Sequence, residues 1–386
     1  MNLAKTFKNI DKELLFLTIF LFGFGLLNIV TSSSREAVLV NKAGVYFYFY
    51  RQMIIFIISI ILSIIVFKFP TKSHQLFWPI LYVIVLGLCT YCFFQSAKRG
   101  AQNWIQIGNF QFQPSELAKP VIIVSLATLF DKWYDKLRNP LLLKEHNFII
   151  GIILFVGFLI PLLIFFQKDL GTATIIVGIV GVLFLFSPVL KKEKIKVIKL
   201  LCIVMVVGIL GLLVTRGYIL SDAQKSRFDY FNPCSKYTTG GYQVCNAYIA
   251  FNDGGIFGLG IGKSKQKYSY IPEPHTDSIF AIIGEEWGVI KSLIFVFIPY
   301  ALILKRIMKI SSEASTIRGR YIALGVGTGI FLHIFINLGG LLGVIPLTGV
   351  PLPFLSYGGT YTMCLMVSIA LVERVAYETK TRKVKI

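Results

Sequence analysis

The sequence predicts an all-α polytopic membrane protein with ten transmembrane helices. Of its 386 residues, 55% are hydrophobic and only 15% are charged, and the mean hydropathy is +0.71. Ordinary soluble domains carry about 25% charged residues. Apolar stretches of about 20 residues, long enough to cross the hydrocarbon core of a bilayer, recur along the whole chain. These observations exclude a soluble multidomain protein and a β-barrel.

Ten stretches have the length and apolarity of a transmembrane helix. No small-residue cleavage site follows the first of them, so we expect a retained span and not a removable signal peptide. The predicted spans are residues 13–31, 48–68, 76–94, 115–131, 147–167, 170–188, 197–215, 277–304, 321–345 and 353–373.

The distribution of positive charge predicts the side on which each loop lies. The net charge is +20, and with a cytoplasmic N-terminus every inner segment is basic, as the positive-inside rule requires. We therefore expect both termini in the cytoplasm and a large extracytoplasmic loop, residues 216–276, between helices 7 and 8. Membrane topology explains the charge, and no nucleic-acid partner is expected.

The chain shows no internal repeat and no separate soluble domain. The sequence therefore predicts a single membrane domain over residues 1–386. Function is expected among polar residues within the spans and on the long outer loops, because polar groups at membrane depth are costly and are kept for a purpose.

The most informative feature is the segment Ile271–Asp277, which reads IPEPHTD. It closes the longest polar segment, and Asp277 stands at the start of the eighth span. Burial can raise the pKa of a carboxylate at the membrane–water border, and a lipid-borne substrate can reach it. Asp277 is the candidate catalytic residue, with Glu273 and Thr276 beside it. His275 either shapes the same site or caps the helix, and both interpretations stay open.

A second set of polar residues lies just before the fourth span and in its first turns. Ser115 and Glu116 begin a predicted helix, and Glu116 and Lys119 lie on one face of it at i,i+3 spacing. At that depth the two charges form either a structural ion pair or part of a polar cavity that meets Asp277. Trp104, just upstream, is either a cavity residue or an interfacial anchor.

Other acids have simpler interpretations. Asp169 stands before the sixth span and is predicted to cap that helix. Glu285 and Glu286 are adjacent, so they point to different faces of the eighth span; one of them is expected to pair with a basic residue.

The outer loop carries a set of basic side chains. They contact anionic lipid headgroups in one interpretation, and in the other they dock a phosphorylated or pyrophosphorylated substrate. The candidates for docking are Arg227, Lys263, Lys265 and Lys267.

Residues 337–359 form a stretch broken by Pro and Gly at the outer face, and it contains Ser356 and Tyr357. Such backbone is tolerated at membrane depth where it is buried or lines a cavity. Alternatively, its glycines serve close helix packing.

The cysteines fall into two classes. Cys89 and Cys92 lie in an apolar span without other potential metal ligands, so a packing role is favoured over a metal or redox site. Cys234 and Cys245 lie in the outer loop, where an oxidising exterior favours a disulfide between them over two free thiols.

Together these segments resemble the SEDS family of cell-wall proteins, which includes RodA, FtsW and SpoVE. The matching stretches follow the family order and cover nearly the whole chain. They are GAQNWI from Gly100, FQPSELAK from Phe112, QKDLGTA from Gln167, GYQ from Gly241, PEPHTD from Pro272, IGEEWG from Ile283 and PLTGVPLPFLSYGG from Pro346. The chain departs from the family pattern at Asn103 (usually Arg), Lys168 (usually Pro) and Ser278 (usually Phe). Without an Arg at position 103, only the nearby Lys98 and Arg99 are left to bind phosphate in that loop.

The resemblance implies a peptidoglycan glycosyltransferase of the cytoplasmic membrane, for cell elongation, cell shape or division. Such proteins polymerise lipid II, a disaccharide-pentapeptide on undecaprenyl pyrophosphate, at the outer face. They work with a class B penicillin-binding protein and with other elongation or division proteins. The resemblance implies no organic cofactor and leaves open a divalent cation, Mg²⁺ or Mn²⁺.

The essential acid of the family maps onto Asp277, as a general base or a metal ligand. Glu116 and Lys119 would orient Asp277, and the loop cations would hold pyrophosphate. The remaining candidates for the cavity are Trp104, Gln113, Ser115, Glu273, His275, Thr276, Ser356 and Tyr357.

Two other functions compete with this one. A lipid II flippase would need polar residues through the full depth of the bilayer. Here the candidates cluster in the outer half, which favours chemistry at the outer surface. A non-catalytic scaffold for division or elongation proteins would tolerate Asp277→Asn.

Overall fold

The computed structural model describes residues 9–97, 100–108, 110–214, 232–237, 241–268 and 271–383. It is a bundle of long helices with one short antiparallel hairpin, β1 (Ile105–Ile107) and β2 (Phe110–Phe112). The first helices are α2 (Lys12–Leu39), α3 (Phe47–Lys68), α4 (Thr71–Tyr91), η1 (Cys92–Phe94), α5 (Pro114–Lys132), α6 (Tyr134–Arg138), η2 (Pro140–Leu142), α7 (Leu143–Phe166), α8 (Leu170–Leu185) and α9 (Lys191–Val214). The later ones are η3 (Pro233–Lys236), α11 (Tyr242–Gly254), α12 (Ile279–Ser292), η4 (Leu293–Phe297), α13 (Ile298–Glu313), α14 (Ile317–Leu341) and α15 (Thr360–Lys383).

Within the described residues, seven helical stretches are long and apolar enough to cross a membrane. They correspond to the predicted spans 1, 2, 3, 5, 8, 9 and 10. The apolar helix α8 is shorter, α5 carries Glu116 and Lys119 near its start, and α9 begins in a run of lysines. The fold is thus a helical membrane bundle, and the total of ten spans stays a prediction.

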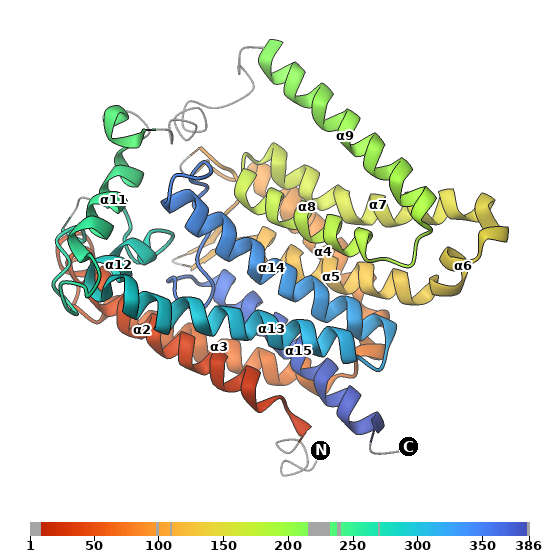
Figure 1. The fold of residues 1–386 in the computed structure, drawn as a ribbon, viewed down its shortest axis with the longest axis horizontal. Helices are drawn as coiled ribbons and strands as arrows, with labels where there is room; N and C mark the ends of the chain where they lie inside the picture. The colour runs from red at the N-terminus through yellow and green to blue at the C-terminus, as the bar shows by residue number, and fades with distance from the viewer. Residues whose placement is uncertain are drawn as a thin grey trace.

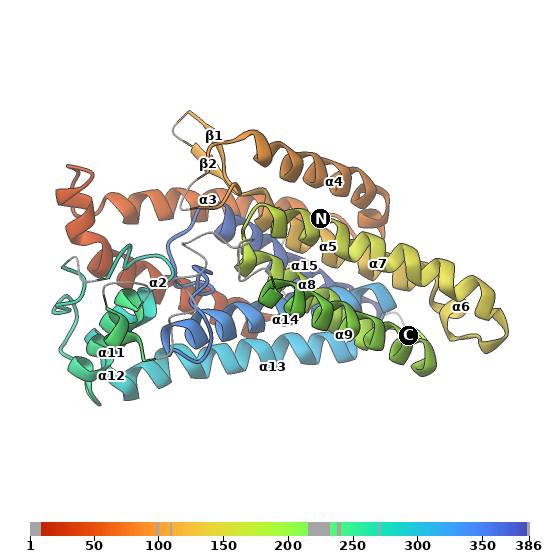
Figure 2. The ribbon, with the colours of Figure 1, turned by 90° about the horizontal axis from the view of Figure 1, so that it is seen from above.

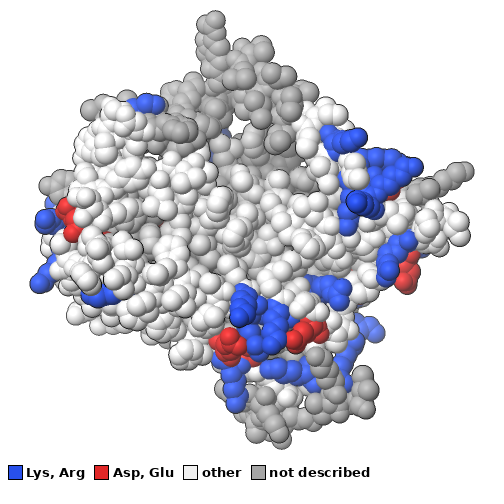
Figure 3. Space-filling view, in the orientation of Figure 1, with Lys and Arg blue, Asp and Glu red and all other residues white. Residues whose placement is uncertain are grey.

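One end of the bundle gathers segments that the sequence predicts to be cytoplasmic. Lys380 Nζ donates to the carbonyl oxygen of Ile10 at 3.0 Å, which brings the two chain ends together. The Glu378 carboxylate accepts hydrogen bonds from the backbone N–H (2.8 Å) and hydroxyl (2.6 Å) of Thr71. Figure 3 shows Lys and Arg concentrated towards this end, with a broad uncharged surface beside them.

The opposite end gathers segments that the sequence predicts to lie outside. Gln102 N donates to the carbonyl oxygen of Gln167 at 2.9 Å, and Tyr357 N donates to the carbonyl oxygen of His275 at 2.8 Å. Helices α11 and α12 lie at this end of the bundle and α6 lies at the other (Figures 1 and 2). The predicted motifs therefore meet at one end of the bundle. This is expected, because successive loops of a membrane bundle lie on alternating sides of the membrane.

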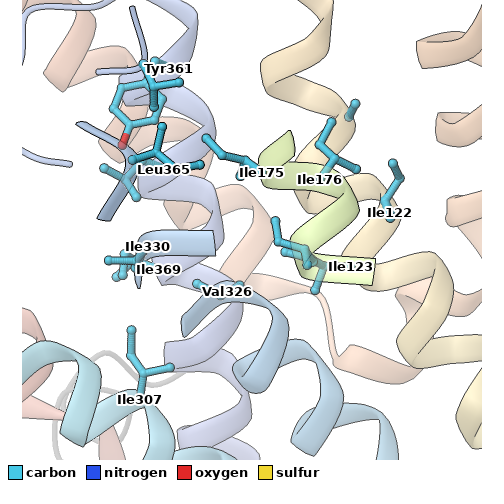
Figure 4. Packing of buried hydrophobic residues seen from close by; sticks show 14 of the residues in the cluster. Ile122, Ile123, Ile175, Ile176, Ile307, Val326, Ile330, Tyr361, Leu365 and Ile369 are labelled. Carbon is cyan, nitrogen blue, oxygen red and sulfur yellow. The ribbon is translucent and has the colours of Figure 1, made fainter. Parts of the chain in front are cut away.

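Helix α5 forms the centre of the bundle, because nearly every residue from Pro114 to Phe130 is buried. Its side chain Ile123 faces α14 at Gly325, where an added Cβ would lie 2.8 Å from Ile123 Cγ2. Figure 4 shows Ile123 packed among aliphatic side chains of α8, α14 and α15. In lipid such contacts stabilise the bundle through van der Waals packing, since hydrocarbon surrounds the helices on all sides.

Three predicted spans have clearly different bounds in the structure. The first span was predicted to end at residue 31, but α2 continues to Leu39. The tenth span was predicted to start at residue 353, but α15 begins at Thr360. The reason is that Pro346, Pro351 and Pro353 each lack a backbone donor and interrupt helical hydrogen bonding. The eighth span was predicted to end at residue 304, but α13 continues to Glu313.

Helix α12 is broken at Gly288, whose φ of 74° and ψ of 178° are not helical. The break leaves the carbonyl oxygens of Glu285 and Glu286 to accept hydrogen bonds from Leu259 N (3.0 Å) and Gly260 N (2.9 Å). A Cβ at position 288 would lie 2.3 Å from the backbone nitrogen of Gly258, so only glycine fits. The outer loop is thereby fixed against the start of the eighth span.

Candidate active site

Asp277 lies two residues before the start of α12, and a side chain of α14 holds its main chain. Asn337 Nδ2 donates to the carbonyl oxygen of Asp277 at 2.6 Å and to that of Val350 at 2.7 Å. Thr276 Oγ1 lies 3.0 Å from Asp277 Oδ1, and the side chain of Asp277 is half-exposed. The backbone is therefore fixed while the carboxylate stays accessible.

The Pro- and Gly-rich stretch before α15 forms a second support for the Asp277 segment. Ser356 Oγ donates to the carbonyl oxygen of Thr276 at 2.6 Å and accepts from Leu352 N at 2.8 Å. Tyr357 N donates to His275 O. Burial raises the pKa of the Tyr357 phenol, although the neighbouring Arg51 guanidinium opposes the shift. The structure thus brings Ser356 and Tyr357 together with the Asp277 segment.

His275 is buried and stacks between aromatic rings. Its ring centroid lies 4.2 Å from that of Tyr48 and 5.3 Å from that of Tyr357. Its Nδ1 atom lies 3.4 Å from Glu36 Oε2, and Tyr48 OH donates to Glu36 Oε1 at 3.0 Å. Sequence reasoning missed Glu36 and Tyr48. The only signal was an acid near the end of the first apolar run.

Glu116 and Lys119 form a buried ion pair that extends to a histidine on α14. Lys119 Nζ lies 2.8 Å from both carboxylate oxygens of Glu116 and 2.8 Å from His333 Nε2. His333 Nδ1 lies 3.2 Å from the carbonyl oxygen of Pro351, so we assign the ring proton to Nδ1. The pair therefore contacts the Pro- and Gly-rich stretch that supports Asp277.

A cavity of about 40 Å³ adjoins this ion pair and is lined by Glu116, Lys119, His333 and Tyr361. The ion pair therefore locks α5 to α14, and Asp277 is not among the residues that line the cavity. Sequence reasoning missed His333, whose only signal was a single histidine inside an apolar span.

Asp169 caps α8 as predicted, since its Oδ1 accepts from Thr172 N at 3.1 Å. Its Oδ2 accepts from Asn103 Nδ2 at 2.6 Å and from Gln113 Nε2 at 3.0 Å. Asn103, where the family usually has Arg, therefore helps to fix the outer hairpin. Trp104, next to it, is half-buried, and Ser115 is buried at the start of α5.

The loop cations occupy different environments. Lys267 is buried, with Nζ 3.5 Å from Glu286 Oε1 and bonded to the carbonyl oxygen of Gly262. Lys263 and Lys265 are exposed, and Lys265 Nζ lies 3.7 Å from Asp253 Oδ2. Arg227 lies outside the described residues. Of the three loop lysines predicted to dock substrate, Lys263 and Lys265 are therefore the exposed ones.

The two adjacent acids of the eighth span have separate roles. Glu286 pairs with Lys267, which is the basic partner that the sequence predicted for one of them. Glu285 accepts from the backbone N–H of Lys265 at 2.7 Å and from the hydroxyl of Ser264. Both acids thus anchor the end of the outer loop.

A disulfide bond joins Cys234 to Cys245 and thereby ties η3 to the first turn of α11. Two residues before Cys245, Gln243 Nε2 donates to Ser278 Oγ at 2.6 Å. The disulfide therefore belongs to a substructure that contacts the residue directly after Asp277.

Asp277 would need ligands from outside the protein to hold a divalent ion. Among the described residues, no group of three His, Cys, Asp or Glu side chains gathers as a metal site. Mg²⁺ commonly binds one or two carboxylates, with water and substrate phosphates completing its octahedron. A single carboxylate facing a pyrophosphate fits that pattern.

Comparison with known proteins agrees with this geometry. The family model for FtsW, RodA and SpoVE, described as a cell cycle protein, matches residues 12–381. A probable peptidoglycan glycosyltransferase FtsW of Bacillus subtilis is 35% identical over 98% of this chain and 93% of its own length. The stage V sporulation protein E of the same organism is 29% identical over 95% and 96%.

Solved structures share the fold at lower identity. A chain of a peptidoglycan synthase complex aligns with a TM-score of 0.75 and 21% identity, covering 96% of this chain and 98% of that one. The rod shape determining protein RodA of Thermus thermophilus aligns with a TM-score of 0.66 and 21% identity, over 95% and 96%. With its many apolar helices, this chain is a multi-pass protein of the cytoplasmic membrane, and it belongs to the FtsW/RodA/SpoVE family.

Proposed function

We propose that this protein is a peptidoglycan glycosyltransferase that polymerises lipid II at the outer face of the cytoplasmic membrane. One observation carries the proposal. The half-exposed carboxylate of Asp277 lies where three separate motifs of the family converge, on a backbone that Asn337 and Ser356 hold fixed. Relatives that cover nearly the whole chain are named probable peptidoglycan glycosyltransferases.

The reaction needs one base. A hydroxyl oxygen of the acceptor sugar attacks the anomeric carbon of the donor, and the bond from that carbon to the pyrophosphate oxygen breaks. The electron pair leaves with the polyprenyl pyrophosphate, and the hydroxyl proton passes to the Asp277 carboxylate. One displacement inverts an α-linked donor to a β-linked product. A positioned general base contributes about 10²- to 10⁴-fold to such a step.

The leaving group needs positive charge and no strong acid, because pyrophosphate is already a good leaving group. The exposed Lys263 and Lys265 supply charge at the outer loop, and Arg227 is expected to add to it. A divalent ion, if the reaction uses one, would be held by Asp277 and would supply further positive charge. Glu116 and Lys119 position the site through His333 and Pro351 and do not contact the reacting atoms.

We further propose that a class B penicillin-binding protein is the partner and crosslinks the strands that this protein makes. A structural neighbour belongs to a peptidoglycan synthase complex that coordinates polymerization and crosslinking. Other elongation or division proteins would recruit the pair to its site of action.

Transport of lipid II is the competing function, and it would require a polar passage through the bundle. The cavity at Glu116 and Lys119 has a volume of about 40 Å³, which accommodates a few water molecules and no saccharide headgroup. This observation favours chemistry at the outer end over passage through the centre.

The test reconstitutes the wild-type protein, with and without its penicillin-binding partner, and supplies purified lipid II with Mg²⁺ or Mn²⁺. We expect glycan strands on a gel and no movement of labelled lipid II across vesicles. Movement without strands under every condition would assign the flippase function. Neither strands nor movement, from a protein that still binds its partner, would leave the scaffold function.

A further inference from the structure

The outer end of the bundle contains a second, much larger pocket of about 330 Å³. One wall is the last turn of α2, with Arg35, Glu36, Leu39 and Val40, and the other is Lys267 with residues 271–274. The pocket thus lies along the backbone that leads directly into Asp277. The reaction described above assigns it no role.

Arg35 gives the pocket its chemical character. Its Nη1 atom is buried and has no hydrogen-bond partner. Within the described part of the chain Arg35 forms no ion pair, and its guanidinium carbon lies 5.8 Å from the centroid of the Tyr268 ring. A buried guanidinium donor without an acceptor is costly, so this arrangement favours an anionic ligand that accepts from it.

The other charged residues that line the pocket are Glu36, Glu273 and Lys267, and each of them already has a partner. Glu36 accepts from Tyr48 OH and lies beside His275, so its carboxylate is directed towards those rings. Lys267 pairs with Glu286. Arg35 is therefore the pocket cation whose charge is available, and its planar donor fork suits a phosphate or pyrophosphate group.

The surroundings of the pocket indicate that the anion is attached to an apolar chain. Leu39 and Val40 are 62% and 72% exposed at the end of a membrane-spanning helix. The pocket therefore borders both the polar outer end and the lipid-facing surface. Hydrogen bonds link the pocket residue Glu273 to the catalytic carboxylate. The Glu273 carbonyl oxygen accepts from Thr276 N at 3.1 Å, and Thr276 Oγ1 contacts Asp277.

We propose that this pocket binds the phosphate-bearing headgroup of a prenyl-linked substrate, with Arg35 as the anion-binding residue. The inference rests on the proposed function, because it takes the lipid-linked saccharide as the substrate. An anionic phospholipid carries the same phosphate chemistry, so the experiment must separate the two sources.

The first test measures binding without catalysis. Wild type, Arg35→Gln and Arg35→Lys are placed in nanodiscs of phosphatidylcholine and titrated with undecaprenyl pyrophosphate or with phosphatidylglycerol. We expect Arg35→Gln to weaken binding of the prenyl pyrophosphate about ten-fold or more, and Arg35→Lys to recover part of it, while phosphatidylglycerol binding does not change. The matched control is Lys42→Gln, an exposed outer cation that does not line the pocket.

Two binding results would overturn the inference. Arg35→Gln could bind prenyl pyrophosphate as tightly as the wild type, or it could lose only phosphatidylglycerol binding, which would make the pocket a site for bulk lipid. This assay requires no turnover. It therefore distinguishes failure of the pocket assignment from failure of the glycosyltransferase assignment.

The second test measures kinetics once polymerisation is established. We expect Arg35→Gln to raise the KM for lipid II about ten-fold, because Arg35 binds the phosphate group of the substrate before the reaction begins. An unchanged KM with a strongly reduced kcat would contradict a binding role.

Discussion

A single side-chain nitrogen, Nδ2 of Asn337, donates to the backbone carbonyl oxygen of Asp277 at 2.6 Å and to that of Val350 at 2.7 Å. It joins three elements at one point: α14, the turn before α12 and the Pro- and Gly-rich stretch before α15. The position of the catalytic carboxylate therefore depends on a residue that never needs to touch substrate.

Replacing Asn337 with Ala leaves the buried carbonyl oxygen of Val350 and the part-buried one of Asp277 without this donor, and a buried group left unpaired costs about 1–3 kcal/mol. We expect Asn337→Ala to lower kcat at least ten-fold with little change in the KM for lipid II. Steady-state polymerisation measures both. Asn337→Asp keeps the shape but loses the donors, so it should behave like Ala. Wild-type kcat in a folded Asn337→Ala protein would contradict this positioning role.

Removing Lys119 leaves the Glu116 carboxylate buried without its partner. Breaking one side of a buried pair costs about 3–5 kcal/mol. We therefore expect Lys119→Met, in detergent, to unfold at a clearly lower temperature than the wild type. The double variant Glu116→Gln with Lys119→Met should recover much of the loss, because no uncompensated charge remains.

His333 reports whether that ion pair acts on the site or only on stability. We expect His333→Phe, which cannot accept from Lys119 or donate to Pro351, to reduce kcat about ten-fold or more. His333→Gln retains polar groups and should retain more activity. Equal activity of the two variants would show that the link to Pro351 is not used.

The cytoplasmic end contains a pH-sensitive ion pair. Burial alone would raise the pKa of the Asp11 carboxyl, but hydrogen bonds from Arg306 and the Leu14 backbone hold it below its ordinary value of 3.8. A lowered folded pKa contributes stability above that ordinary value and loses it as pH falls through the folded pKa. We therefore expect Asp11→Asn to be less stable than wild type at pH 7.

The lowered pKa of Asp11 also predicts how the difference in stability between wild type and Asp11→Asn changes with pH. It should shrink as pH falls below about 4, where the wild-type carboxyl also becomes neutral. Thermal unfolding at a series of pH values measures it. A difference that stays constant down to the lowest pH at which the protein is folded would contradict the assignment.

The disulfide should protect the outer loop from local opening. Closing an 11-residue separation restricts the unfolded loop by about 2–3 kcal/mol in the chain-entropy description. We expect Cys234→Ser with Cys245→Ser to speed limited proteolysis between α9 and α12 under oxidising conditions. Cys202→Ser, at an exposed free cysteine, is the control. Equal proteolysis of all three proteins would contradict this expectation.

Much of the fold could be predicted, because an apolar stretch of about 20 residues directly indicates a membrane-spanning helix. Every predicted range overlaps a helix of the described residues, but the eighth helical stretch continues to Glu313, and the tenth begins late because three prolines delay its helix to Thr360. The motif segments of the site were also visible locally, as polar residues at the borders of apolar runs.

The contacts that assemble the site could not be predicted in the same way. Glu36, Tyr48 and His333 join it through packing between helices that are far apart in the sequence, and no local pattern encodes that proximity. Lys267 resembled an exposed loop cation, but the backbone break at Gly288 brings its segment against Glu286, where it is buried.

The most direct test of the central claim compares lipid II polymerisation by wild type and Asp277→Asn, each purified with its penicillin-binding partner. Glu145→Gln, an exposed carboxylate-to-amide change at the opposite end, serves as the matched control. We predict glycan strands from wild type and control, and none from an Asp277→Asn protein that is folded and binds the partner. Strands from Asp277→Asn at a wild-type rate would contradict the role of Asp277 as the catalytic base.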